Sequence, residues 1–469
     1  MEKKIIAIGG ALTFLFTGVV FAEEKTVFFV ELSYDFQERE QLSAFLEQET
    51  EHTYFYIEEQ WWRELSEEDQ EEVPDILKEA GEEFEEHIFP EISSFLGDMP
   101  KHKVVGEEEK VVVLFHQMKE DSGGYFRTGD QYSTYQYPHS NEKNIVYVNT
   151  DFIKNRNLKS YLAHEYTHLV TFNEKNKRQR VSEEVWLNEL RAEMMISLLG
   201  YNDVYEGSNL EIRVNSFLHD PDFSLTDWTD QGPDYGVVNL FGHYLVDHYG
   251  EEVLSRSLKS SFVGIPSIDF ALWEGGYDKK FKDVFKDWVV AVYLNDCFYG
   301  EQYCYKNENL KNINVSHSNI FISAQNRESF SLKYKTKNWA GNWHRIVGGE
   351  GVLYLDFQSE KDFIIPYIIC EKGGRCELKE IKENEEGEQK ITVEEFNSKY
   401  ESLTIIPFLG ERVVGFEGPE KSFSFMWEAR ISSPDRSEKW IEVWETLEEI
   451  RTRIENLYNI FGIEIKEYN

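Results

Sequence analysis

The sequence predicts an α+β fold, in which a mixed sheet and a run of helices are followed by a small β-sandwich and a C-terminal helix. Three observations predict it. Strand-like segments dominate up to about residue 150, apolar residues at helical spacing dominate from about 157 to 249, and short alternating strands begin near 307. Strands followed by a run of helices are typical of the α+β class.

The first part of the chain contains apolar or alternating segments that predict strands. They are TVFFVEL, TYFYIE, VVVLFHQM and NIVYVNT, the last ending at Thr150. Between residues 66 and 96, apolar residues at helical spacing predict helical structure, and Pro74 is tolerable there in the first turn of a helix. The stretch before NIVYVNT is rich in Gly, Tyr and Ser and predicts a loop.

Three further helices are predicted at about 157–172, 183–199 and 236–249. Gly200 and Gly250 end the second and third of them, because glycine readily adopts the left-handed conformation that closes a helix.

The last third of the chain returns to short alternating strands. GVLYLDF, FIIPYIIC, LTIIPF, ERVVGF and SFSFMWEARI predict a separate β-sandwich. Beyond them, apolar side chains from Trp440 to Leu457 share one helical stripe. We expect this helix to pack on a neighbouring domain; binding of a partner is the alternative.

The N-terminus predicts export. MEKKIIAIGGALTFLFTGVVFAEEK has two lysines, an apolar run from Ile5 to Phe21 and a charged stretch after Ala22, which is typical of a cleaved secretory signal. An uncleaved membrane anchor is the alternative, because the run approaches the ~17 residues that can span a bilayer. In both cases we expect a secreted or cell-surface protein, which meets a membrane only if the segment stays attached.

Charge and cysteine content limit the partners. Acidic residues outnumber basic ones by 87 to 49, and the resulting charge of -38 repels nucleic acid, so we expect no nucleic-acid partner. We also expect the protein to be a monomer. Calcium is possible, but no D-x-[DN]-x-[DN]-G loop predicts a site for it. Four cysteines allow three connectivities, of which two local disulfides, Cys297–Cys304 and Cys370–Cys376, are expected in an exported protein.

The segment HEYTH carries the residue types of a zinc site. Zinc prefers a tetrahedral set of imidazole and carboxylate ligands, and a catalytic site leaves the fourth place to water. His164 and His168 are four residues apart and share one face of a helix, while Glu165 projects about 100° around the axis, where it can act as a general base. The alternative is a chance occurrence of the string, with histidines that only form hydrogen bonds.

The next predicted helix places Glu189 and Glu193 on one face. Two like charges at this spacing are unfavourable, above all when desolvated, so a positive group is expected beside them. Zinc would satisfy Glu189, and an imidazole N–H would satisfy Glu193 and fix the tautomer of a ligating histidine. An acidic face turned towards Arg191 or solvent is the alternative, against which the apolar neighbours Trp186 and Leu190 argue.

The chain resembles a known group of enzymes in this region. HEYTH, followed by WLNE and then by a carboxylate four residues further on, resembles the gluzincin metallopeptidases; with GYFRTGD, SNEKNIVYVNT and SEEVWLNELRAE it is most similar to the hyicolysin-like peptidases. The resemblance implies one catalytic zinc with three ligands, His164, His168 and Glu189. It also implies that Glu193 supports His164, with Asn188 in the same surrounding layer of polar groups.

The resemblance covers roughly residues 53–255, with one departure beside a ligand. Related sequences commonly read WLNEG, whereas this chain has Leu190 in place of the glycine. Thr171 and Glu174 stand where a metzincin needs a glycine and a histidine, and the GxMEN string of the aminopeptidase-type gluzincins is absent. We therefore expect an endopeptidase.

The mechanism implied by the resemblance needs two further groups. Glu165 would take the proton of the attacking water and pass it to the leaving amine. A Tyr or His donor would stabilise the oxyanion, and Tyr235 is the candidate, with His243 as the second choice; packing roles are the alternative for both. The strand NIVYVNT is expected as an edge strand over the zinc helix, where an extended peptide could bind.

We therefore expect an exported zinc endopeptidase that acts on protein or peptide. An inactive peptidase-like binding module and a zinc hydrolase of another substrate are the alternatives. Five parts are expected. They are a signal peptide at 1–22, an N-terminal segment with the first part of the catalytic region at 23–105, a catalytic domain at 106–305, the sandwich at 306–432 and the terminal amphipathic helix at 433–469.

Overall fold

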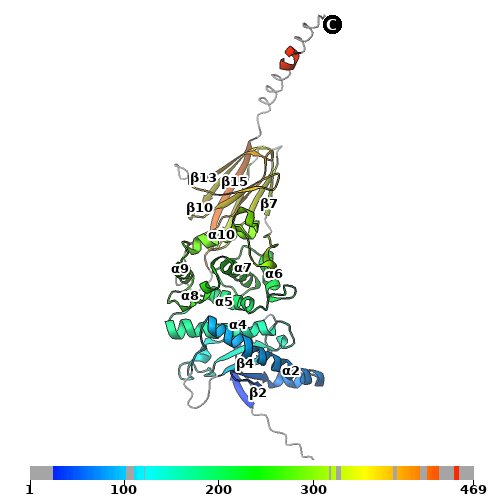
Figure 1. Ribbon diagram of the computed structural model, residues 1–469, viewed down its shortest axis with the longest axis vertical. Helices are drawn as coiled ribbons and strands as arrows, with labels where there is room; N and C mark the ends of the chain where they lie inside the picture. Colours follow the sequence, from blue (N-terminus) through cyan, green and yellow to red (C-terminus); the bar gives the residue numbers. More distant parts are fainter. Residues whose placement is uncertain are drawn as a thin grey trace, which may run out of the picture. The chain divides into compact units, whose positions relative to one another are not determined.

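Figure 1 shows the computed structural model of the chain. It describes residues 25–101, 110–120, 122–315, 318–323, 329–383, 388–411, 420–432 and 448–453. These residues form two compact units. One contains the described residues up to Glu85 and between Lys101 and Leu158, and the other contains Glu86–Pro100 and the described residues from Lys159 onward. The predicted signal segment lies outside the described residues.

The first unit is built on a six-stranded mixed sheet. Its strands are β1 (Lys25–Phe29), β2 (Gln41–Glu49), β3 (Thr53–Glu58), β4 (Val111–His116), β5 (Gly124–Phe126) and β6 (Ile145–Asn149), in the order β1-β2-β3-β4-β6-β5. The three neighbouring strands β3, β4 and β6 run parallel, and the remaining pairs are antiparallel. Strand β2 was not predicted.

The prediction that NIVYVNT is an edge strand is wrong. Its β6 lies between β4 and β5, and all five of its residues are buried, as expected of a strand with neighbours on both sides. The edge is β5, a three-residue strand inside the segment predicted as a loop. It forms there because Tyr125 is buried and stacks on Tyr147 of β6, with ring centroids 4.3 Å apart.

The segment between residues 66 and 96, predicted to be helical, forms two helices joined by a π-helical turn. Helix α1 (Glu59–Glu64) precedes α2 (Glu67–Glu83), a π-helical turn (Phe84–Ile88) and α3 (Phe89–Phe95). Pro90 is the second residue of α3 and has no N–H to donate to the preceding turn, which accounts for the irregular hydrogen bonding there.

The second unit contains the predicted helical run. Its helices are α4 (Leu158–Phe172, which begins at the unit boundary), α5 (Val185–Leu198), α6 (Asn209–His219), α7 (Gly232–Tyr249), α8 (Glu252–Lys259), α9 (Ile265–Glu274) and α10 (Phe281–Leu294). The predicted helices correspond to α4, α5 and α7, whereas α6 and α8–α10 were not predicted. Helix α7 begins earlier than expected, because Gln231 and Asp234 form a capping box. Both α5 and α6 pack against α7.

The same unit ends in a sandwich-like arrangement of nine strands. They are β7 (Ser318–Ile322), β8 (Phe330–Thr336), β9 (His344–Gly348), β10 (Gly351–Ser359), β11 (Pro366–Glu371), β12 (Cys376–Glu380), β13 (Gln389–Phe396), β14 (Tyr400–Ile405) and β15 (Phe423–Ser432). One leaf is β8-β15-β10-β13 and the other contains β12, β11, β14, β9 and β7; a single pair, Phe396 with Tyr400, joins them. One apolar core is shared by both leaves. The α+β class with a sandwich-like sheet is therefore confirmed.

The remaining predictions about the last third have mixed outcomes. Both disulfides are present as expected, Cys297–Cys304 and Cys370–Cys376. Most of ERVVGF and most of the predicted terminal helix lie outside the described residues, although residues 448–453 are helical with exposed side chains. None of the helices in the described ranges combines the length and apolarity needed to cross a membrane.

Candidate metal centre

Helix α4 places two histidines one turn apart on one side. The helix forms locally because Leu162 and Leu169 supply buried apolar positions and its interior contains no Gly or Pro. His164 and His168 are 8% and 7% exposed, so their ring nitrogens lie in a site from which most water is excluded. Their shared face follows from the four-residue spacing.

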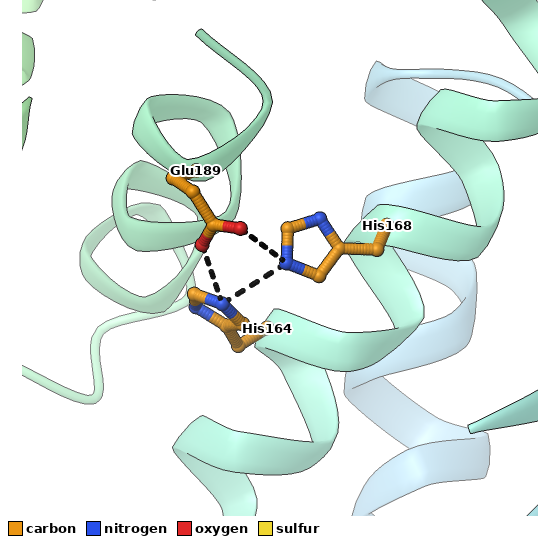
Figure 2. Close-up of side chains that lie close together, drawn as sticks. All are labelled: His164, His168 and Glu189. Atoms are coloured by element: carbon orange, nitrogen blue, oxygen red, sulfur yellow. Dashed lines mark hydrogen bonds and ion pairs between the residues drawn. The ribbon is translucent and has the colours of Figure 1, made fainter. Parts of the chain in front are cut away.

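Helix α5 brings a carboxylate to these nitrogens, and Figure 2 shows the three side chains converging. Glu189 Oε2 lies 3.2 Å from His164 Nε2, and Glu189 Oε1 lies 3.5 Å from His168 Nε2. The two Nε2 atoms are 3.1 Å apart. Among the described residues, this is the one group of three or more His, Cys, Asp or Glu side chains placed closely enough to share an ion.

These separations fit a tetrahedral zinc ion. Ligand atoms about 2.0–2.1 Å from zinc at tetrahedral angles lie about 3.4 Å from one another. Glu189 Oε2 also has no hydrogen-bond partner of ordinary geometry among the described residues, although His164 Nε2 is close to it. Atoms that are near but not aligned with one another are expected when each directs a lone pair to a common point.

The electrostatics of the three residues also favour a cation. Burial is the largest single influence and lowers the pKa of His168, but the charge and hydrogen bonding of Glu189, together with the charge of Glu165, raise that pKa to about 9. Burial raises the pKa of Glu189, yet the charges and hydrogen bonds of His168 and His164 together hold it far below its usual range. A positive charge among these three side chains is therefore favoured, whether a proton or a metal ion supplies it.

Glu165 lies between the two histidines in the sequence of α4. Its side chain is buried, and burial raises the pKa of its carboxyl group. Within the described part of the chain, its Oε2 has no hydrogen-bond partner. A buried carboxyl group with a raised pKa and a free acceptor atom is suited to take up and release a proton.

Glu193 is fully buried on α5, one turn after Glu189. Its Oε1 is 3.5 Å from His164 Nδ1, and it accepts a bidentate pair of hydrogen bonds from Arg213, with Nη2–Oε1 at 2.8 Å and Nε–Oε2 at 3.0 Å. Oε2 also accepts from Asn209 and Asn239, at 2.8 and 3.1 Å. Burial raises the pKa of Glu193, but the charges of Arg213 and His164 and the hydrogen bonds from Arg213 and Asn209 together keep the pKa below its usual range.

Asn188 precedes Glu189 in α5, and its side chain is close to His168. Its Oδ1 and His168 Nδ1 are both buried, and neither has a hydrogen-bond partner among the described residues. After burial and Glu189, the Asn188 side chain is a smaller influence on the pKa of His168. Histidines that bind metals commonly have such a polar neighbour at the second ring nitrogen.

Tyr235 lies near the start of α7, with its ring against Arg213. The guanidinium carbon is 4.5 Å from the ring centroid, and the hydroxyl group donates to Asp230 Oδ1 at 3.2 Å. Burial, then the charges of Glu189 and Asp230, raise the pKa of Tyr235 far above its usual value. The side chain therefore stays protonated and able to donate a hydrogen bond near the histidine–glutamate group.

His243 lies two turns further along α7 and does not join the group. Its Nε2 is 3.1 Å from Ser197 Oγ, and its Nδ1 is 3.4 Å from Asn307 Nδ2. Burial lowers its pKa to about 4, so the ring is neutral near pH 7. These contacts favour the packing role that the sequence left open for this residue.

The sequence reasoning did not identify Arg213, Asn209 and Asn239. Two of them lie on α6, which was not predicted. The sequence does contain a signal for the start of α6. Ser208 and Glu211 have the spacing of an N-cap, and Leu210 is the first of several apolar residues at helical spacing. In the structure the Ser208 side chain accepts a hydrogen bond from the Glu211 N–H.

Comparison with known proteins finds sequence similarity over part of the chain. No protein-family model matches the chain. The chain is 30% identical over 188 residues to "Neutral metalloprotease ShpI" of Staphylococcus hyicus. The match covers 36% of this chain and 41% of the relative, so it spans less than half of that protein.

Similarity to solved structures is slight. The chain has 11% identity and a TM-score of 0.16 to the Yersinia pseudotuberculosis-derived mitogen, covering 23% of this chain and 90% of that one. For Aeromonas hydrophila PliG, a periplasmic lysozyme inhibitor of g-type lysozyme, the identity is 9% and the TM-score 0.17, over 25% of this chain and all of that one. Scores this low support no conclusion about fold or function.

Proposed function

We propose that this chain is an exported zinc-dependent endopeptidase of the gluzincin type. The observation that carries the proposal is the separation of 3.1–3.5 Å between the two Nε2 atoms and the Glu189 carboxylate, which suits one tetrahedral ion. The similarity to a neutral metalloprotease supports the same class of activity.

The proposed ligands are His164, His168 and Glu189. A zinc ion held by them would act as a Lewis acid on the scissile carbonyl and lower the pKa of a bound water towards neutrality. Glu165 would accept the proton released as water attacks, and would deliver it to the leaving amine. Its raised pKa and its free acceptor atom support this role.

Two further residues have proposed roles around the ligands. Glu193 would accept from His164 Nδ1–H, which leaves Nε2 unprotonated for the ion. Tyr235 would give up its hydrogen bond to Asp230 and instead donate a hydrogen bond from its hydroxyl group to the oxyanion. His243 has both ring nitrogens near protein partners, so we assign it no role in the reaction.

Export agrees with the covalent structure of the chain. Both disulfides, Cys297–Cys304 and Cys370–Cys376, are of the kind that persists in oxidising compartments. We propose that the protein acts outside the cytoplasm on protein or peptide substrates, as a monomer and without a nucleic-acid partner.

Metal content and peptide hydrolysis test the proposal together. The chain from residue 23 onward should bind one zinc per molecule by elemental analysis and should cleave casein and an internally quenched peptide. Glu165→Gln should keep the zinc but lower kcat by at least about 100-fold, because proton transfer by a positioned group typically contributes 10²–10⁴-fold. Glu252→Gln, at an exposed position of α8, is the matched control and should leave both properties unchanged.

The outcomes separate the possible functions. Zinc binding without cleavage of any peptide, but with hydrolysis of another substrate, would favour a different hydrolase. Zinc binding without any hydrolysis would favour a binding module. Full cleavage by Glu165→Gln, or cleavage that survives complete removal of metal by a chelator, would contradict the proposed mechanism.

A further inference from the structure

Arg213 uses two different surfaces of one guanidinium group. Its edge forms the bidentate pair with Glu193, at 2.8 and 3.0 Å, and its flat face lies 4.5 Å from the centroid of the Tyr235 ring. Its side chain is only 16% exposed, so both contacts are made largely away from water. The residue therefore stands between the carboxylate that faces His164 and the tyrosine proposed to act on substrate.

The edge contact orients Glu193. A carboxylate has about four acceptor positions, two on each oxygen. Four hydrogen bonds reach Glu193: Arg213 Nε, Asn209 and Asn239 donate to Oε2, and Arg213 Nη2 donates to Oε1, so that both positions on Oε2 and one on Oε1 are taken. The position that remains is on Oε1, the oxygen that faces His164 Nδ1 at 3.5 Å. Because Glu193 is fully buried, its charge also depends on the cation beside it.

The face contact holds Tyr235 from one side. The indole of Trp228 meets the same ring edge-on, with centroids 4.7 Å apart, and Asp230 accepts from the hydroxyl group at 3.2 Å. The position of the ring therefore depends on Arg213 as much as on its own helix. Helix α6 can approach this closely because Gly236 follows the tyrosine: a Cβ there would lie 2.9 Å from the backbone oxygen of Arg213.

We propose that Arg213 is a positioning residue that couples the metal ligands to Tyr235. Through Glu193 it sets the orientation of His164, and through its face it sets the place of the tyrosine ring, so that disturbing either contact disturbs the other. Only arginine offers a planar fork and a stacking face in one group; lysine keeps the charge but loses both. The inference rests on the proposed function, because it takes His164 as a zinc ligand and Tyr235 as a reacting group.

Zinc affinity, measured by competition with a chromophoric chelator, tests the coupling without any activity assay. Tyr235→Phe keeps a ring for Arg213 and should bind zinc as the natural chain does. Tyr235→Leu removes the ring and should weaken binding about 5-fold, within the range of couplings between residues in contact. In an Arg213→Lys background, which itself should bind zinc about 10-fold more weakly, the difference between Phe and Leu should disappear.

Peptide hydrolysis at saturating zinc gives the second measurement. Arg213→Lys should lower kcat about 10-fold with KM changed less than 3-fold, because Tyr235 is displaced while zinc and substrate still bind. The effect should be at least 3-fold smaller in a Tyr235→Phe background, where no hydroxyl group is left to misplace. Arg178→Lys, at a half-exposed arginine that pairs with Glu174, is the matched control and should change neither measurement.

Three results would overturn the inference. The two contacts are not coupled if Tyr235→Phe and Tyr235→Leu bind zinc equally well. The same conclusion follows if the difference between these two variants persists in the Arg213→Lys background, or if the Arg213 and Tyr235 substitutions affect kcat independently. A natural chain that binds zinc but cleaves nothing would refute the proposed function, and the chelator experiment would still decide the coupling. If Arg213→Lys does not fold, the Phe and Leu variants alone decide it.

Discussion

Glu189 and Glu193 are the same amino acid, one helical turn apart, in opposite surroundings. Glu189 has an oxygen without a hydrogen-bond partner among the described residues and faces two imidazole nitrogens. Glu193 is surrounded by donors from Arg213, Asn209 and Asn239. At the second position the guanidinium group of Arg213 balances the carboxylate, whereas the first carboxylate faces the two histidines, so the two should respond differently to the loss of their charge.

The first prediction compares zinc affinity at these two positions. Glu189→Gln should weaken binding by more than about 100-fold, because it removes the anionic ligand itself. Glu193→Gln should weaken it by about 10–100-fold, the range typical of partners that orient a ligand. Competition with a chelator at fixed pH measures both. Equal affinities for Glu189→Gln and the natural chain would show that Glu189 does not bind the ion.

His344 is a buried histidine far from these ligands in the sequence, on strand β9. Neither ring nitrogen has a hydrogen-bond partner among the described residues, and rings of Tyr334, Phe425 and Trp427 surround it. Burial lowers its pKa to about 4, an effect that the charge of Asp222 only partly offsets. The folded sandwich therefore holds this side chain in its neutral form.

Stability should consequently depend on pH through His344. Its folded-state pKa lies below the unfolded value of about 6.5, so the unfolded chain binds the extra proton first and stability falls as pH drops from about 6.5 towards 4. Between pH 8 and pH 5 the loss should be about 2 kcal/mol. Urea unfolding of the natural chain and of His344→Leu at both pH values measures it as a difference between the two pH dependences. Identical pH dependence would contradict the expectation.

Among the elements, α7 lies against both α5 and α6 through two glycines. A Cβ on Gly236 would lie 2.7 Å from the backbone nitrogen of Phe217 and 2.9 Å from the backbone oxygen of Arg213 on α6. A Cβ on Gly242 would instead lie 2.8 Å from the Cγ and Sδ atoms of Met194 on α5, part of a flexible side chain. The backbone of α6 cannot move aside as easily as the flexible Met194 side chain can.

The two glycines therefore predict different results for one substitution. Gly236→Ala should lower the free energy of unfolding by about 1–3 kcal/mol, because α6 must move to admit the methyl group. Gly242→Ala should change it by less than about 1 kcal/mol, since the helix gains stability on losing a glycine while Met194 shifts. Urea unfolding of both variants is the measurement. Similar losses for the two would show that α6 and α7 are not held at the distance described.

At the scale of the molecule, the helices of the second unit and its sandwich share one apolar core. Trp339 and Trp343, from the sandwich side, belong to the same cluster as Phe285 and Trp288 of α10. Trp343 Nε1 donates to the carbonyl oxygen of Val289 at 2.9 Å. The expected boundary between residues 305 and 306 runs through this cluster, so we expect the two parts to unfold together.

Trp343→Ala tests this cooperation. The loss of a large buried side chain and its hydrogen bond should cost about 3–5 kcal/mol. In native-state hydrogen exchange followed by mass spectrometry, peptides from α10 and from β14 should lose protection by similar free energies. Trp427→Ala, within the sandwich core alone, is the comparison variant. Loss of protection confined to β14 in the Trp343 variant would show that the helices are stable without the sandwich.

The sequence by itself determined the features that depend on near neighbours. The four-residue spacing places His164 and His168 on one face of α4, because helical geometry repeats every 3.6 residues. The two disulfides join cysteines separated by 7 and 6 residues, so their pairing could be predicted from proximity along the chain. The α+β class follows in the same way from the order of strand-like and helical periods.

Only the tertiary structure decided the contacts between distant segments. Arg213 is 20 residues from Glu193 and Asn239 is 46 residues from it, and no periodic pattern relates such positions. The placing of β6 inside the sheet depends on β5, which is too short to be recognised from its own residues. Local backbone geometry repeats with a fixed period, whereas the pairing of distant segments is set by the packing free energy of the whole chain.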